Sequence, residues 1–231
     1  DGGAYPNPVG SGDLEGGGDI CLWLLSELTT DVDYESWNAL RPFLNQYKFA
    51  GYVNDEKITV FQWLQKNIIA YLPIHVVNGA NGLKPVMDMF QSQVEIAPRL
   101  SITEGTEFQR VGPVVSLNSP EDVSNHVTVR YAMNGVIEDY STFVQVSNKI
   151  PAAGTLASIS YVAHPKSMIS IQRYGEKKKV VELDFCYDNP TAQRIAQDIL
   201  EREAIPTKSV QYSVSLRYGY LVLGDILEIT D

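Results

Sequence analysis

Apolar residues recur at helical spacing in three segments of the first third of the chain. Asp19, a good N-cap, is expected to open the first helix. The second begins at Asp33 and contains Pro42, which should bend or restart it. The third opens at Thr59, since Thr59 and Gln62 have the spacing of a capping box. The predicted apolar faces hold Ile20, Trp23, Leu24 and Leu28, then Trp37, Leu40, Phe43 and Leu44, and finally Val60, Phe61, Leu64 and Ile68.

After Pro73 the pattern changes from helix to strand. Residues 74–77 and 83–87 are apolar runs that flank a turn-rich spacer at 78–82, which predicts a β-hairpin. Residues 1–18 carry seven glycines and two prolines and show almost no periodicity, so they read as a flexible Gly-rich arm or linker. The pattern therefore predicts an arm over 1–18 and a helix-plus-hairpin unit over 19–88.

Residues 89–231 are dominated by strand patterns, with one helix expected over 189–204. Asn189 is its predicted cap and Pro190 occupies its first turn. Its apolar stripe consists of Ala192, Ile195, Ala196, Ile199 and Leu200. The predicted strands cover residues 108–117, 126–132, 156–162, 168–173, 180–185, 209–217 and 226–229. A polar stretch near 134–155 reads as an insertion. The fold class is α+β: the helix-plus-hairpin unit followed by a mostly antiparallel, barrel-like β domain that carries one helix.

Charge and composition narrow the choice of function. The chain is 44% hydrophobic and 20% charged, as expected of a folded protein, and its net charge is −10. Both parts are acidic, which argues against sequence-specific binding of DNA or RNA. The one basic cluster, residues 177–179, is expected at a solvated hairpin tip. No apolar run is long enough to insert into a membrane, and no signal peptide is visible. Because the first residue is Asp1, we expect an excised or processed piece.

Candidate chemistry is sparse. Cys21 and Cys186 lie in apolar segments and are expected to be buried and reduced. Three histidines, His75, His126 and His164, stand apart without metal or catalytic spacing, so no metal and no cofactor is expected. The paired carboxylates at residues 31 and 33 and at residues 184 and 188 are explained structurally by the helix starts beside them. A catalytic pair of carboxylates formed by tertiary contact stays an open alternative. The sequence therefore predicts no enzyme and no catalytic residue.

Aromatic side chains allow two interpretations. Trp23, Trp37 and Trp63 fall on predicted helices with apolar neighbours, which favours core packing over a carbohydrate site. Three tyrosines, Tyr212, Tyr218 and Tyr220, lie near a predicted strand pair. Because tyrosine is common at protein interfaces, we predict that these three face a partner subunit.

An ordered series of motifs in the last third resembles a known family. The series is SIQRYG at 170–175, a strand, DNPTA at 188–192 opening a helix, AQDILER at 196–202, Pro206, a strand, and LGDILEITD at 223–231. Earlier segments contribute to the same resemblance, namely DVDY at 31–34, GYVND at 51–55, Leu72-Pro73 and GLKPV at 82–86. Together, over residues 19–231, they resemble the tail-tip and baseplate hub proteins of tailed phages: the J-type host-specificity, T4-like hub, late-control and gene-transfer-agent tail proteins. The insertion near 134–155 departs from that pattern.

This resemblance implies a structural role in the virion tail, assembled in the cytoplasm of the bacterial host. The implied assembly is a homotrimeric hub ring that continues the tail tube, contacts distal tail, tube, spike or fibre proteins, and passes DNA through its lumen without binding it specifically. An acidic wall suits such a conduit because it repels phosphates. Two alternatives stay open: a domain that binds a host receptor or glycan, and a tail enzyme that degrades the cell wall.

Overall fold

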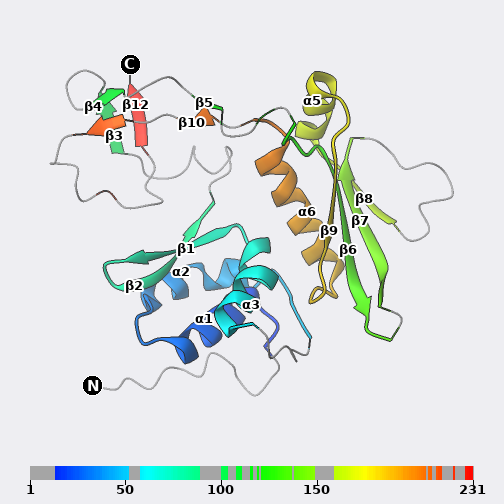
Figure 1. The fold of residues 1–231 in the computed structure, drawn as a ribbon, viewed down its shortest axis with the longest axis horizontal. Coiled ribbons are helices and arrows are strands. Elements are labelled where there is room, and N and C mark those ends of the chain that lie inside the picture. Colours follow the sequence, from blue (N-terminus) through cyan, green and yellow to red (C-terminus); the bar gives the residue numbers. More distant parts are fainter. Residues whose placement is uncertain are drawn as a thin grey trace.

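The computed structural model describes residues 14–51, 58–88, 100–103, 108–110, 115–116, 119, 121–136, 138–148, 159–206, 208–209, 212–214, 221 and 227–230. Figure 1 shows a group of helices with a hairpin, a four-stranded sheet covered by two further helices, and a set of short paired strands near the C-terminus. The long helix α6 lies between the first two groups. The chain is α+β, as predicted, although the arrangement of its strands differs from the prediction.

Residues 14–88, apart from 52–57, form what we call the helical unit. Its elements are α1 (Gly17–Leu28), α2 (Tyr34–Leu44), α3 (Val60–Asn67), the 3-10 turn η1 (Ile69–Tyr71), β1 (Ile74–Gly79) and β2 (Gly82–Met87). The predicted starts of α2 and α3 are confirmed. Asp33 accepts a hydrogen bond from Ser36 N (3.1 Å), and Thr59 and Gln62 form a reciprocal capping box. The predicted hairpin is also confirmed, with β1 and β2 antiparallel from Ile74↔Met87 to Gly79↔Gly82.

Helix α1 begins earlier than predicted and buries a different face. Its N-cap is Gly16, and Asp19 lies inside the first turn. A Cβ atom on Gly16 would lie 2.4 Å from Asn45 Oδ1, and one on Gly18 would lie 3.1 Å from the Arg41 carbonyl oxygen. These glycines therefore serve close packing against the end of α2, rather than flexibility. Residues 14–18 belong to the folded unit, and the rest of the predicted arm, 1–13, lies outside the described residues.

The glycine face of α1 replaces the predicted apolar stripe. The buried positions are Gly17, Gly18, Cys21, Leu22 and Leu25. Trp23 and Leu28, which the stripe placed in the core, are 41% and 44% exposed. For these two residues the prediction was wrong, whereas Ile20 and Leu24 pack partly against the core. Apolar residues occupy both sides of this helix, and the small residues select the side that packs.

The four-stranded sheet, called the mixed sheet below, corrects the predicted antiparallel barrel. It contains β6 (His126–Asn134), β7 (Asp139–Ser147), β8 (Ile159–Ala163) and β9 (Lys178–Glu182), in the order β8-β7-β6-β9. Only the central pair β6–β7 is antiparallel, and both outer pairs are parallel. No closed barrel is formed by the described strands. The connection between β7 and β8 is long enough to return the chain in the same direction, whereas β9 follows α5 antiparallel to β8 and is therefore parallel to β6.

The predicted insertion near 134–155 is wrong for its first half. Residues 139–147 form β7, one of the two central strands, and Asn134 pairs with Asp139 across the connecting turn. Val144 and Val146 are completely buried opposite Val129 and Val127. The alternation of apolar with polar residues in this segment is that of a half-buried strand. Residues 149–158 lie outside the described part.

A second helix, α5 (Pro165–Tyr174), stands where a strand was predicted over 168–173. Proline in its first turn and Gly175 at its C-cap, with φ 74°, mark its two ends. The residues that α5 buries are two serines, Ser167 and Ser170, so the sequence has no buried apolar stripe that would predict this helix. The lysines at 177–179 consequently lead into and open β9, rather than forming a hairpin tip.

Helix α6 (Asn189–Glu203) matches the prediction closely. Its cap is Asp188 rather than Asn189: the carboxylate accepts from Thr191 N at 2.9 Å. The whole predicted stripe is buried, namely Ala192, Ile195, Ala196, Ile199 and Leu200. This stripe lies against β6 and β7, and other side chains of α6 reach the helical unit. Lys48 N donates to Thr191 Oγ1 (2.8 Å), and Arg202 Nη1 donates to Asp88 Oδ2 (3.1 Å).

Six short strands pair two by two. They are β3 (Leu100–Thr103) with β12 (Leu227–Thr230), β4 (Phe108–Arg110) with β11 (Tyr212–Val214), and β5 (Val115–Ser116) with β10 (Lys208–Ser209). The first pair is parallel and the other two are antiparallel. Each pair joins a segment before the mixed sheet to one after α6.

The contact between α6 and the helical unit contains a perturbed carboxyl group. Tyr47 OH donates to Asp198 Oδ2 at 2.6 Å. Burial raises the pKa of Asp198 to about 6, although Tyr47 and two arginines, Arg202 and Arg194, favour its charged form. The folded state therefore binds a proton on Asp198 more tightly than the unfolded chain, whose aspartates titrate near ~3.9. The resulting stabilisation is present at acid pH and is lost as the pH rises through about 6.

We predict that Asp198→Asn stabilises the protein at pH 7 by about 1–2 kcal/mol, because the amide accepts the Tyr47 hydrogen bond without a buried charge. Urea unfolding at pH 7 and near pH 4.5 measures the difference. The extra stability of Asp198→Asn over the parent chain should shrink or vanish at the lower pH, where the carboxyl of Asp198 in the folded parent chain is protonated. A variant that is less stable than the parent chain at pH 7 would show that the arginines outweigh burial.

Candidate functional site

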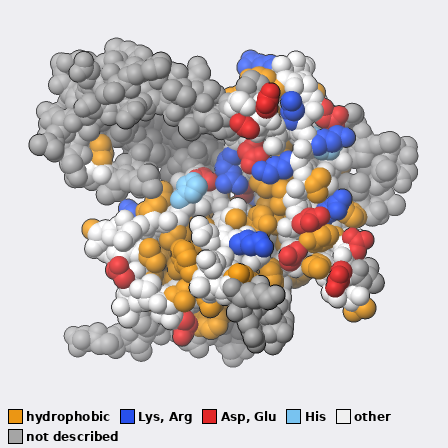
Figure 2. Space-filling model, in the orientation of Figure 1, with side chains coloured by type: hydrophobic (Ala, Val, Ile, Leu, Met, Phe, Trp, Pro, Cys, Tyr) orange, Lys and Arg blue, Asp and Glu red, His pale blue; other side chains and the backbone are white. Residues whose placement is uncertain are grey.

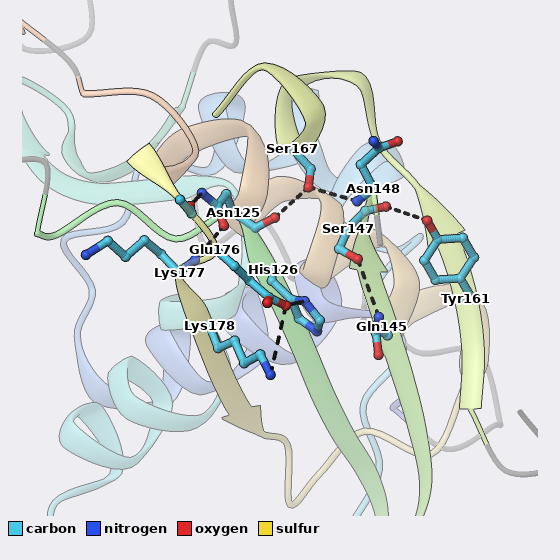
Figure 3. Close-up of polar contacts among 11 residues, drawn as sticks. Asn125, His126, Gln145, Ser147, Asn148, Tyr161, Ser167, Glu176, Lys177 and Lys178 are labelled. Atoms are coloured by element: carbon cyan, nitrogen blue, oxygen red, sulfur yellow. Dashed lines mark hydrogen bonds and ion pairs between the residues drawn. The ribbon is translucent and has the colours of Figure 1, made fainter. Parts of the chain in front are cut away.

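The densest cluster of buried polar side chains lies at one end of the mixed sheet, next to α5. Here β6 and β9 begin, β7 and β8 end, and α5 packs across the end of the sheet (Figures 1 and 3). We call this group the polar end cluster. Its members are Asn125, His126, Gln145, Ser147, Asn148, Tyr161, Ser167, Ser170, Glu176, Lys177 and Lys178.

Asn125 is the centre of this cluster and is completely buried. Its Nδ2 donates to Ser170 Oγ (3.0 Å) and to the Gly175 carbonyl oxygen (2.7 Å). Its Oδ1 accepts from Lys177 N (2.8 Å). One side chain thus connects the start of β6 to the last turn of α5 and to the segment that leads into β9. Both amide protons and the amide oxygen are satisfied, so its burial carries little desolvation penalty.

Hydroxyl groups extend the cluster across β7 and β8. Ser167 Oγ donates to the Asn125 carbonyl oxygen (2.6 Å) and accepts from Asn148 N (2.9 Å). Tyr161 OH donates to the Ser147 carbonyl oxygen (2.9 Å), and Gln145 Nε2 donates to Ser147 Oγ (3.4 Å). Figure 3 shows these contacts joining neighbouring strands and α5. The cluster therefore fixes where the sheet ends and where α5 sits on it.

A histidine–carboxylate pair belongs to the same cluster. His126 Nδ1 lies 2.9 Å from Glu176 Oε1, and Lys178 Nζ lies 3.9 Å from the same oxygen. Val127 pairs with Val146, so His126 and Ser147 lie beside that pair on adjacent strands. Serine, histidine and glutamate are the residue types of acyl-transfer enzymes.

The burial of Ser147 argues against that chemistry. Ser147 is completely buried, and its hydroxyl accepts from Gln145. A nucleophile must be within reach of a substrate atom, and none can approach this hydroxyl without opening the sheet. The arrangement fits a structural role, in which ionic and hydroxyl groups satisfy one another at the end of the sheet.

The other histidines are paired singly with carboxylates. His75 Nε2 lies 2.7 Å from Asp88 Oδ1. His164 Nε2 lies 3.3 Å from Glu201 Oε1, and burial lowers the pKa of this histidine. Within the described ranges, no three His, Cys, Asp or Glu side chains come together as a metal site.

Both cysteines are free and buried, as predicted. Burial raises the pKa of Cys186 to about 11 and raises that of Cys21 further. A thiol with a raised pKa holds little thiolate near neutral pH, so neither group is a nucleophile in this fold.

The predicted aromatic sites have mixed outcomes. Trp37 is completely buried, as predicted, and Trp63 packs partly against the core, whereas Trp23 is 41% exposed. Of the predicted interface tyrosines, Tyr212 lies in β11, opposite Arg110 of β4. Tyr218 and Tyr220 lie outside the described residues. The interface at these three positions stays a prediction.

Comparison with known proteins identifies the class of the C-terminal third. Residues 156–231 match the family model described as "Putative phage tail protein". This third of the chain is therefore similar to a domain of phage tail proteins. A search of curated proteins gave no match. Of the helices that the structure describes, none has both the length and the apolar character needed to cross a membrane.

The matched segment does not contain its own strand partners. Its described strands are β8, β9, β10, β11 and β12, and they pair with β7, β6, β5, β4 and β3 in that order. All five partners precede residue 156. The two central strands of the mixed sheet thus come from residues outside the match, and the structural unit extends upstream to at least Leu100.

We predict that Asn125→Ala lowers the free energy of unfolding by about 2–4 kcal/mol, because it leaves the buried Ser170 hydroxyl, the Gly175 carbonyl oxygen and Lys177 N without their partner. Guanidinium unfolding of the whole chain measures the loss. The matched control is Asn134→Ala at the exposed end of β6, which should change stability by no more than ~0.5 kcal/mol. Equal losses in the two variants would contradict the role given to Asn125.

Proposed function

We propose that the chain is a structural, non-enzymatic component of the phage tail tip, where copies of it form part of the hub ring that continues the tail tube. The observation that carries the proposal is the match of residues 156–231 to a phage tail protein family. In this role the ring supports DNA delivery and host attachment. It contacts distal tail, tube, spike or fibre proteins and, during attachment, a host receptor.

Two properties of the chain support a structural part in a conduit. The net charge of −10 suits a wall past which DNA slides, since like charges repel and no phosphate is held. Asn125 and Ser147 of the polar end cluster are completely buried and hydrogen-bonded within it, so neither offers a reactive group to a substrate. Both features favour a scaffold over a tail enzyme.

Labelling of intact virions tests this proposal. Antibodies against the chain, applied to a phage that encodes it, should bind at the tail end distal to the capsid in electron micrographs. Quantitative mass spectrometry of purified tails should give about three copies per tail, the number of a trimeric ring. The chain's absence from purified tails, label along the tail shaft, or copies in the hundreds would overturn the hub assignment. Label on lateral fibres would instead support the receptor- or glycan-binding alternative.

A further inference from the structure

Strand β9 is one edge of the mixed sheet, and among the described residues no strand lies on its outer side. In a parallel pair, alternate residues turn their backbone groups toward the neighbouring strand. Leu183 N donates to the Arg130 carbonyl oxygen (2.9 Å), so the residues two and four positions before Leu183 also face β6. The residues between them, Lys178, Val180 and Glu182, therefore turn their N–H and C=O groups to the open edge.

The side chains of these three residues lie on the face of the sheet opposite α6. Lys179, the neighbour of Lys178, points the other way and reaches Glu203 of α6 (Nζ to Oε1, 2.6 Å). The side chains of Lys178 and Glu182 are 65% and 52% exposed, and Val180 is 54% exposed. An open edge strand with an exposed β-branched residue at its centre is a template for a further strand.

The sequence of β9, KKVVE, is complementary to itself when two copies run antiparallel. With Val180 opposite Val180 of the second copy, Lys178 of each copy lies opposite Glu182 of the other. Opposite charges directly across a strand pair stabilise it, as does a pair of β-branched side chains. A parallel pairing in the same register would instead place like charges side by side, so the charges select the antiparallel arrangement.

Charges of both signs surround β9. On the face drawn in Figure 2, basic, acidic and hydrophobic side chains intermingle over α6 and the mixed sheet. Lys178 Nζ lies 3.9 Å from Glu176 Oε1, as Figure 3 shows, and Arg130 Nη1 lies 3.2 Å from Glu182 Oε1. Antiparallel pairing would join the two ion pairs into one row of alternating sign. Tyr71 OH donates to the Glu182 carbonyl oxygen (3.3 Å), which keeps a second lone pair for a strand.

We propose that β9 pairs antiparallel with β9 of a second copy, so that the mixed sheets of two free chains continue into one sheet across a two-fold axis. A ladder of this length buries less area than a stable dimer needs, so the expected Kd is on the order of 100 µM. The proposal concerns the free chain and does not rest on the proposed function, whose ring has a three-fold axis.

Charge reversal tests the pair by sedimentation equilibrium of the 231-residue chain between about 10 µM and 1 mM. Lys178→Glu places acid opposite acid, and Glu182→Lys places base opposite base, so each variant alone should associate about tenfold more weakly. An equimolar mixture of the two should recover the parent affinity, because an acidic edge then faces a basic one. The matched controls, Lys66→Glu and Glu27→Lys, change exposed residues of the helical unit and should associate as the parent chain does.

Amide hydrogen exchange locates the contact. In the parent chain the amides of Lys178, Val180 and Glu182 should exchange more slowly at the highest concentration than at the lowest. Val180→Lys, at an exposed site, places two like charges at the centre of the pair and is an independent variant that should also weaken it. A parent chain that is monomeric over the whole range would overturn the proposal. Association that the charge variants leave unchanged, or a mixture that associates no better than either variant alone, would overturn it too.

Discussion

The fold depends on the burial of α6 between two otherwise separate layers. One side of this helix places alanines, isoleucines and a leucine against β6 and β7, and all five of these side chains are buried. On other sides, Thr191, Asp198 and Arg202 contact the helical unit through hydrogen bonds. Small residues at 192 and 196 let the sheet approach the helix closely, and this contact excludes water from one continuous core. Without α6, the sheet and the helical unit would each expose an apolar face.

This arrangement changes what the phage tail match means physically. Residues 156–231 supply α5, α6 and the outer strands of the mixed sheet, while earlier residues supply its central strands. The matched segment contains the two edge strands of the mixed sheet but not the two central strands with which they pair, so neither edge strand has a partner within the segment. Asn125 strengthens the same connection, since it joins residues before the match to Ser170, Gly175 and Lys177 within it. The segment and its upstream partners form one folding unit.

Local signals in the sequence predicted the elements whose ends and faces are set locally. The caps at Asp33 and Thr59, the hairpin at 74–87 and the stripe of α6 follow from side-chain spacing, and the structure confirms them. Helix α5 was missed because it buries two serines, while Met168 and Ile169 are exposed. The face of α1 was missed because Gly16 and Gly18 matter only through their distance to α2.

Long-range pairings were beyond the reach of these local patterns. The parallel partners of β8 and β9 depend on tertiary contacts that a period-2 pattern does not encode. The polar end cluster joins Asn125 to groups 45, 50 and 52 residues away, so no spacing in the sequence revealed it. The one available signal was the ordered series of motifs in the last third, and it led to the class of protein that the family match supports.

The most direct test of the central claim is the thermal unfolding of residues 156–231 alone, followed by circular dichroism and compared with the whole chain. The isolated segment should lack a cooperative transition, because its outer strands lose β6 and β7 and α6 loses the sheet on which it packs. A cooperative transition in the isolated segment, with the strand content of the whole chain, would show that the phage tail domain folds by itself and would contradict this account.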